Sequence, residues 1–77
     1  MKKKLLEILA EINPAVDFAK EKNLLDDGLL DSFDIIALVG ELNDAFDIEI
    51  GVEHLLPENF NSLDAIINLI KKLQAGR

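Results

Sequence analysis

With 77 residues, the chain fits one small domain, and we expect residues 1–77 to form it. It contains no cysteine, which excludes disulfides and thiol chemistry by its own side chains and is typical of a cytoplasmic protein. The 15 Asp and Glu residues outnumber the 8 Lys and Arg residues, and the resulting net charge of −7 argues against nucleic-acid binding and favours partners with basic surfaces.

The first predicted element is an amphipathic helix. Its apolar residues recur at helical spacing: Leu5, Leu6, Ile8, Leu9 and Ile12. Asn13 should end this helix, because the residue before a proline is disfavoured in the helical conformation. Charged residues interrupt every apolar run, so we predict neither a signal peptide nor a membrane span. The mostly polar segment 15–28 then predicts a long ordered loop.

A second helix is predicted from Ser32 to Phe46. One face carries apolar residues at spacings of three and four: Ile35, Leu38, Val39, Leu42 and Phe46. Ser32 stands where an N-cap residue is expected, and Asp34 lies in the first turn, where the helix dipole favours an acid. The sequence therefore places a serine and two acids, Asp31 and Asp34, at the start of this helix.

The remaining chain predicts a linker, a helical turn and a last helix. Residues 47–51 alternate like a strand, but no second strand is available to pair with them, so we expect an extended linker. A short helical turn is expected over residues 52–56, before Pro57. Asn61 or Ser62 should cap the last helix, whose apolar stripe is Leu63, Ile66, Ile67, Ile70 and Leu73. The predicted fold is all-α, a small four-helix bundle with three main helices and one short helix.

The supply of reactive side chains is poor. The chain has one histidine and no cysteine, tryptophan or tyrosine, and His54 lies in a loop-like stretch without a nucleophile beside it. We interpret His54 as a solvated or packing residue and expect no enzyme activity. The acids around Gly28 do not match the spacing of a calcium-binding loop, so we predict no metal site.

The segment Asp31-Ser32-Phe33-Asp34 allows two interpretations. In the structural one, Ser32 caps a helix and Asp34 complements its dipole. In the functional one, an exposed serine at a helix start accepts a group from another enzyme, and a phosphodiester there would lie near free helix N–H groups. Ser62 lies in a similar setting, and local physics alone does not separate the two serines.

Residues 25–34, Leu-Asp-Asp-Gly-Leu-Leu-Asp-Ser-Phe-Asp, resemble the phosphopantetheine attachment region of acyl carrier proteins. The helix order and the Phe-Asp-Ile-Glu-Ile exit at residues 46–50 extend the resemblance over nearly the whole chain. It implies a single carrier domain in which Ser32, flanked by Asp31 and Phe33, receives a 4'-phosphopantetheine arm from a phosphopantetheinyl transferase that uses coenzyme A and magnesium. The arm's thiol would hold cargo as a thioester.

The resemblance also implies that the second helix docks partner enzymes, namely a loading ligase and downstream synthases or transferases. The residues that point away from its apolar stripe, or lie at the edge of it, are Phe33, Asp34, Ile36, Ala37, Gly40, Glu41 and Asp44. This face is less acidic than that of the fatty-acid type. We hypothesise that docking relies on apolar contact, unless Ile36 is partly buried, and that charge reversal at Glu41 and Asp44 weakens docking only slightly.

The cargo stays open among fatty acyl, D-alanyl, other aminoacyl and polyketide groups. The Asp-Gly-Leu-Leu-Asp-Ser-Phe string resembles D-alanyl and other stand-alone aminoacyl carriers, whereas fatty-acid biosynthesis would need a cavity among the aliphatic core residues. We expect a monomer. The alternative to a carrier is an unmodified, acidic helical adaptor that binds a basic partner, and the covalent arm on Ser32 distinguishes the two.

Overall fold

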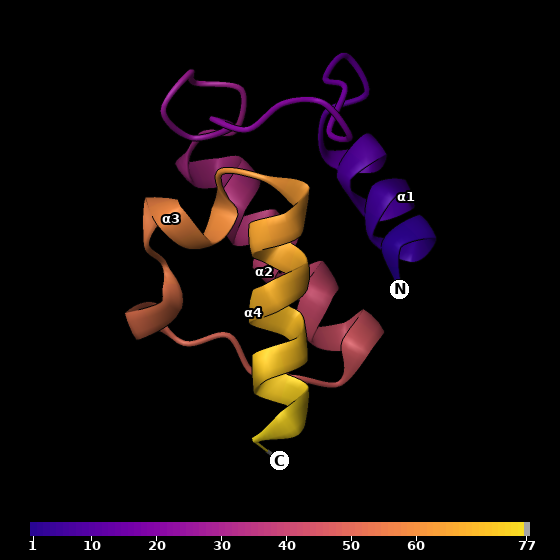
Figure 1. Cartoon of the computed structure of the whole chain (residues 1–77), viewed down its shortest axis with the longest axis vertical. Helices are drawn as coiled ribbons and strands as arrows, with labels where there is room; N and C mark the ends of the chain where they lie inside the picture. The colour runs from indigo at the N-terminus through magenta and orange to yellow at the C-terminus, as the bar shows by residue number, and fades with distance from the viewer. Residues whose placement is uncertain (77) are drawn as a thin grey trace.

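The computed structural model of the protein describes residues 1–76. It contains α1 (Lys2–Ile12), α2 (Ser32–Phe46), a 3₁₀ helix η1 (Val52–His54), α3 (Pro57–Phe60) and α4 (Leu63–Ala75), and no strand within those residues. Figure 1 shows α4 in front of α2, with α1 on one side and α3 on the other. The predicted all-α fold with three main helices is confirmed, and α2 has the predicted bounds.

The helices end where the backbone or the capping residues require it. Asn13 is extended, with φ −151°, and stops α1 before Pro14. Asp47 stops α2 by adopting the left-handed conformation, with φ 52°. The side chain of Ser62 accepts a hydrogen bond from the Ala65 N–H and begins α4, so Ser62 rather than Asn61 is the cap.

The start of α2 corrects one prediction. The N-cap is Asp31, and Ser32 is the first residue inside the helix. Asp31 and Asp34 form a capping box, in which each carboxylate accepts a hydrogen bond from the other residue's backbone N–H. Asp and Ser are both good N-cap residues and are adjacent here, so propensity alone could not choose between them.

The short elements also differ from the expected single turn over residues 52–56. The 3₁₀ helix stops at His54, and a separate helix, α3, begins at Pro57. Proline suits the first position of a helix, because its fixed φ is already helical and its missing N–H has no partner there anyway. Pro57 therefore starts a helix instead of ending a turn.

The buried apolar residues form one core cluster. α1 packs against α2, and α3 packs against α4. The fully buried large side chains come from all four α-helices and from the long loop: Leu5, Leu9, Leu24, Leu30, Leu38, Leu42, Phe60, Ile66 and Ile70. At the far end of α2, the Lys4 ammonium donates to the Ala45 carbonyl (3.3 Å) and lies over the Phe46 ring. None of the described helices is long and apolar enough to cross a membrane.

The long loop between α1 and α2 is ordered by hydrogen bonds, as predicted. The carbonyl of Leu24 accepts from the N–H groups of Leu29 and Leu30, at 2.8 and 3.0 Å. The turn this requires includes Gly28 with φ 73°, a conformation that glycine adopts without strain. The chain therefore reaches Asp31 along a path held by its own backbone.

A candidate attachment site at the start of helix α2

Ser32 offers an accessible hydroxyl. The residue is exposed, and its hydroxyl makes no hydrogen bond with any of the described residues 1–76. The capping of α2 falls to Asp31 and Asp34, at 2.9 Å from the Asp34 N–H to Asp31 Oδ1 and 3.2 Å from the Asp31 N–H to Asp34 Oδ2. Because these carboxylates perform the capping, the hydroxyl of Ser32 is left available for reaction.

Ser62 differs from Ser32 in both respects. It is half-buried, and its Oγ accepts a hydrogen bond of 3.1 Å from the Ala65 N–H at the start of α4. Modification of Ser62 would place a group on a half-buried oxygen that already caps α4. The structure thus separates two serines that local sequence physics left equivalent.

A groove of about 590 Å³ opens beside Ser32. Its lining is mostly apolar and comes from the long loop, α2 and the segment around α3: Leu25, Leu30, Ile35, Ile36, Leu55 and Phe60. Asp31 and Ser32 contribute to its polar part. A chain attached to the Ser32 hydroxyl would start directly at this groove.

The local geometry also fits a phosphodiester on Ser32. The N–H groups of Ser32 and Phe33 are the first of α2 and make no hydrogen bond to another described residue. Free N–H groups and the helix dipole favour a negative group at this end of a helix. One oxygen of each nearby carboxylate, Asp31 Oδ1 and Asp34 Oδ2, is engaged by the other residue's backbone N–H.

Exposed apolar side chains border the site. Phe33 is 81% exposed, Ile36 is 67% exposed and Leu55 is 40% exposed, and the last two line the groove. We call these three residues the apolar rim. Large apolar side chains exposed together on a surface are typical of a region that another protein covers.

Most, but not all, of the predicted docking residues are exposed. Phe33, Ile36, Ala37, Gly40, Glu41 and Asp44 are all exposed on α2. Asp34 is half-buried and its carboxylate is engaged by Asp31. The alternative that Ile36 is partly buried is wrong, because two thirds of its surface is accessible. Whether partners bind this face stays a prediction.

Sequence reasoning missed Asn61, which holds the loop that leads to the site. Its Oδ1 accepts from the N–H groups of Leu25 (2.9 Å) and Asp26 (3.2 Å), and its Nδ2 donates to Asp26 Oδ2 (3.3 Å). The carbonyl of Asn61 also accepts from the Leu24 N–H, at 2.9 Å. The only signal in the sequence was its position next to Ser62, which suggested a cap instead.

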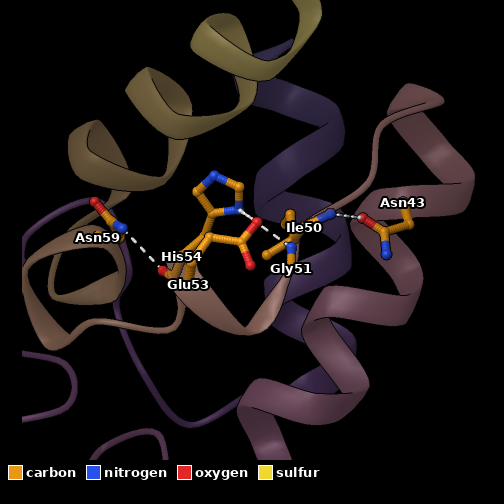
Figure 2. Close-up of polar contacts among 6 residues, drawn as sticks. All are labelled: Asn43, Ile50, Gly51, Glu53, His54 and Asn59. Carbon is orange, nitrogen blue, oxygen red and sulfur yellow. Dashed lines mark hydrogen bonds and ion pairs between the residues drawn. The ribbon is translucent and has the colours of Figure 1, made fainter.

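His54 is half-buried and hydrogen-bonded, in accord with its interpretation as a packing residue. Figure 2 shows its imidazole beside Glu53, with Nδ1 accepting a hydrogen bond from the Gly51 N–H at 3.1 Å. Within the described part of the chain, no three His, Asp or Glu side chains are placed to hold a metal ion together.

Comparison with known proteins also indicates a phosphopantetheine attachment site, and the match covers most of the chain. Residues 3–70 match the family model described as a phosphopantetheine attachment site. A D-alanyl carrier protein of Streptococcus uberis is 33% identical over 55 residues, which cover 71% of this chain and 70% of that protein. A D-alanyl carrier protein of Lactobacillus delbrueckii subsp. bulgaricus is 28% identical over 76 residues, which cover 96% of this chain and 94% of that protein.

Proposed function

Because the chain belongs to the family of carrier proteins with a phosphopantetheine attachment site, we propose that Ser32 is the residue that bears the 4'-phosphopantetheine arm. The protein is a carrier, and the arm, through its terminal thiol, presents cargo as a thioester. The observation that carries the assignment to Ser32 is its exposed, unbonded hydroxyl at the start of α2, beside an apolar groove.

Each part of the site has a role in the attachment. The hydroxyl oxygen of Ser32 forms a bond to the phosphorus of the pantetheine phosphate of coenzyme A. The bond from that phosphorus to 3',5'-ADP breaks, and the hydroxyl proton passes to a base of the transferase or to water. Asp31 and Asp34 hold the first turn of α2 in place, and the N–H groups of Ser32 and Phe33 face the new negative charge.

We propose D-alanine as the cargo. The relatives named D-alanyl carrier proteins support this choice. The aliphatic core residues Leu38, Leu42, Ile66 and Ile70 are fully buried, as those of any helical core would be, so the choice of D-alanine rests on the relatives.

The partners follow from the carrier role. A phosphopantetheinyl transferase attaches the arm, a ligase loads the cargo, and a further transferase removes it, so the protein itself presents the cargo and catalyses no step. We propose that these enzymes meet the outward face of α2 and the apolar rim, and that the carrier works as a single domain and a monomer. A cytoplasmic location agrees with modification by coenzyme A and belongs to the same proposal.

The test is the intact mass after incubation with coenzyme A, magnesium and a broad-specificity phosphopantetheinyl transferase. The wild type should gain one phosphopantetheinyl group and Ser32→Ala should gain none. Ser62→Asn is the matched control, because asparagine also caps a helix and this variant should gain the group like the wild type. A gain that survives Ser32→Ala would move the site, and no gain with an active transferase would favour the unmodified adaptor.

Cargo is tested on the modified protein with a D-alanyl-loading ligase. The mass should rise by one alanyl group with D-alanine and ATP, and hydroxylamine should remove that group, as it does for a thioester. Rapid loading by a fatty acyl ligase without loading of D-alanine would contradict the cargo assignment and leave the attachment site intact.

A further inference from the structure

The 3₁₀ helix η1 is closed by a reciprocal pair of hydrogen bonds between its two ends. The His54 N–H donates to the Gly51 carbonyl at 3.0 Å, and the Gly51 N–H donates back to His54 Nδ1 at 3.1 Å. The imidazole therefore acts as the cap of η1, because Gly51 has no side chain to do so. Only 24% of the His54 side chain is exposed.

Neighbouring elements hold the segment on both sides of this pair. Asn43 of α2 accepts a hydrogen bond from the Ile50 N–H through Oδ1, at 2.9 Å. Asn59 of α3 donates through Nδ2 to the His54 carbonyl, at 2.8 Å. Figure 2 shows the three contacts in a row, with the imidazole in the middle. The conformation of η1 thus depends on side chains from α2, η1 and α3 together.

This segment delivers one wall of the attachment site. Leu55 directly follows His54, belongs to the apolar rim and lines the groove together with Ser32. Its backbone is part of the same short structure, because the Leu55 N–H donates to the Val52 carbonyl at 3.1 Å. A change in η1 would therefore shift Leu55 relative to Ser32.

The contact between Gly51 and His54 requires a neutral imidazole. Nδ1 accepts a hydrogen bond from the Gly51 N–H, and an imidazolium carries protons on both nitrogens and cannot accept a hydrogen bond. Histidine is the side chain whose charge changes most readily between about pH 5 and pH 8. The charged groups around the ring are Glu53 on η1, with Oε1 3.6 Å from Nδ1, and Glu58 and Lys72, which line the same hollow from α3 and α4. The Glu53 carboxylate is close enough to form an ion pair with a protonated ring, and this pair would compete with the contact to Gly51.

We propose that neutral His54 is a positioning residue for the carrier's partner enzymes. It holds η1 so that Leu55 forms one side of the site at Ser32. Protonation of the ring breaks the contact with Gly51 and allows η1 and Leu55 to move. The inference rests on the proposed function, because it assumes that enzymes act at Ser32. It adds a pH dependence that belongs to the carrier itself and not to its partners.

The experiment compares the wild type with His54→Asn, in which Oδ1 replaces Nδ1 as an acceptor for the Gly51 N–H but does not titrate. Both proteins are modified by the same transferase at pH 5.5 to 8, and the ratio of the two rates cancels the enzyme's own pH dependence. We expect the rate of the wild type divided by that of His54→Asn to be near one at pH 8. This ratio should fall about two- to tenfold at low pH, which is the effect of losing one hydrogen bond. His54→Leu, which has no acceptor, should be slow at every pH.

Amide NMR provides a second measurement that does not depend on any enzyme. In the wild type, the Gly51 and Leu55 amide signals should titrate together with the His54 ring, and in His54→Asn they should not. A rate ratio that stays flat while the ring titrates would overturn the inference and leave the attachment site untouched. Absence of modification of the wild type at pH 8 would instead overturn the proposed function, and this inference with it.

Discussion

Asn61 provides the sharpest test of how the loop before α2 is held. The substitution Asn61→Ala removes an acceptor for the N–H groups of Leu25 and Asp26 and a donor to the Asp26 carboxylate. It leaves the backbone hydrogen bond from the Leu24 N–H to the carbonyl of residue 61 in place. The effect therefore isolates the side-chain contacts between the α3–α4 junction and the loop.

The magnitude follows from the surroundings of each group. The contact at Leu25 is partly buried, so its N–H loses a partner that water replaces poorly, whereas the contact at Asp26 is exposed and water takes over there. Together these losses should lower the free energy of unfolding by about 2 kcal/mol. A domain of this size has a total of about 4–12 kcal/mol, so the change is large. It corresponds to a fall in Tm of roughly 8–16 °C.

Urea unfolding followed by circular dichroism at 222 nm measures this change, since the chain has no tryptophan or tyrosine for intrinsic fluorescence. Asn68→Ala is the matched control, because Asn68 is exposed on α4 and the substitution there should be neutral or slightly stabilising. Hydrogen exchange at the Leu25 amide should accelerate in Asn61→Ala only. A loss of stability below about 0.5 kcal/mol, or one equal to that of the control, would refute the reasoning.

Three further predictions concern α2. Asp31→Ala should lower the free energy of unfolding by about 1 kcal/mol, and Asp31→Asn by much less, because asparagine also caps; urea unfolding measures both. The double reversal Glu41→Lys with Asp44→Lys should slow loading by a partner ligase less than about twofold. Ile36→Ser should slow the same reaction about fivefold or more. A larger effect of the double reversal than of Ile36→Ser would contradict apolar docking. Lys4→Met should cost about 0.5 kcal/mol through the loss of a cation at the C-terminal end of α2, and the difference should shrink in high salt.

Periodicity predicted the main helices well, because their apolar faces are regular and their ends carry strong signals. The helix from Ser32 to Phe46 is bounded by acids and small polar residues on one side and by Asp47 on the other. The short elements were harder to predict. Three or four residues are too few for a periodic pattern, and Pro57 serves equally well to end one segment or to begin the next.

Ser32 could be predicted from the sequence as a candidate site residue, whereas the surface around it could not. The motif around Ser32 lies in one continuous stretch of sequence, whereas the groove also needs Leu55 and Phe60 from more than twenty residues away. Asn61 bonds to Leu25, 36 positions earlier, and nothing local in the sequence announces such a contact. Ser32 and Ser62 likewise differ in whether the hydroxyl oxygen caps a helix. Only the hydrogen bonds of the folded chain reveal that difference.

The unbonded hydroxyl of Ser32, the proposed attachment residue, has a consequence for a carrier protein. Replacing its hydrogen breaks no contact of the fold, so attachment of the arm should leave the packing of the helices unchanged. An enzyme that must tell an empty carrier from a full one then has to read the attached group itself. Ser62 differs, because each modification would alter an oxygen that caps α4. The attached group itself, and not a rearrangement of the helices, therefore distinguishes a loaded carrier from an empty one.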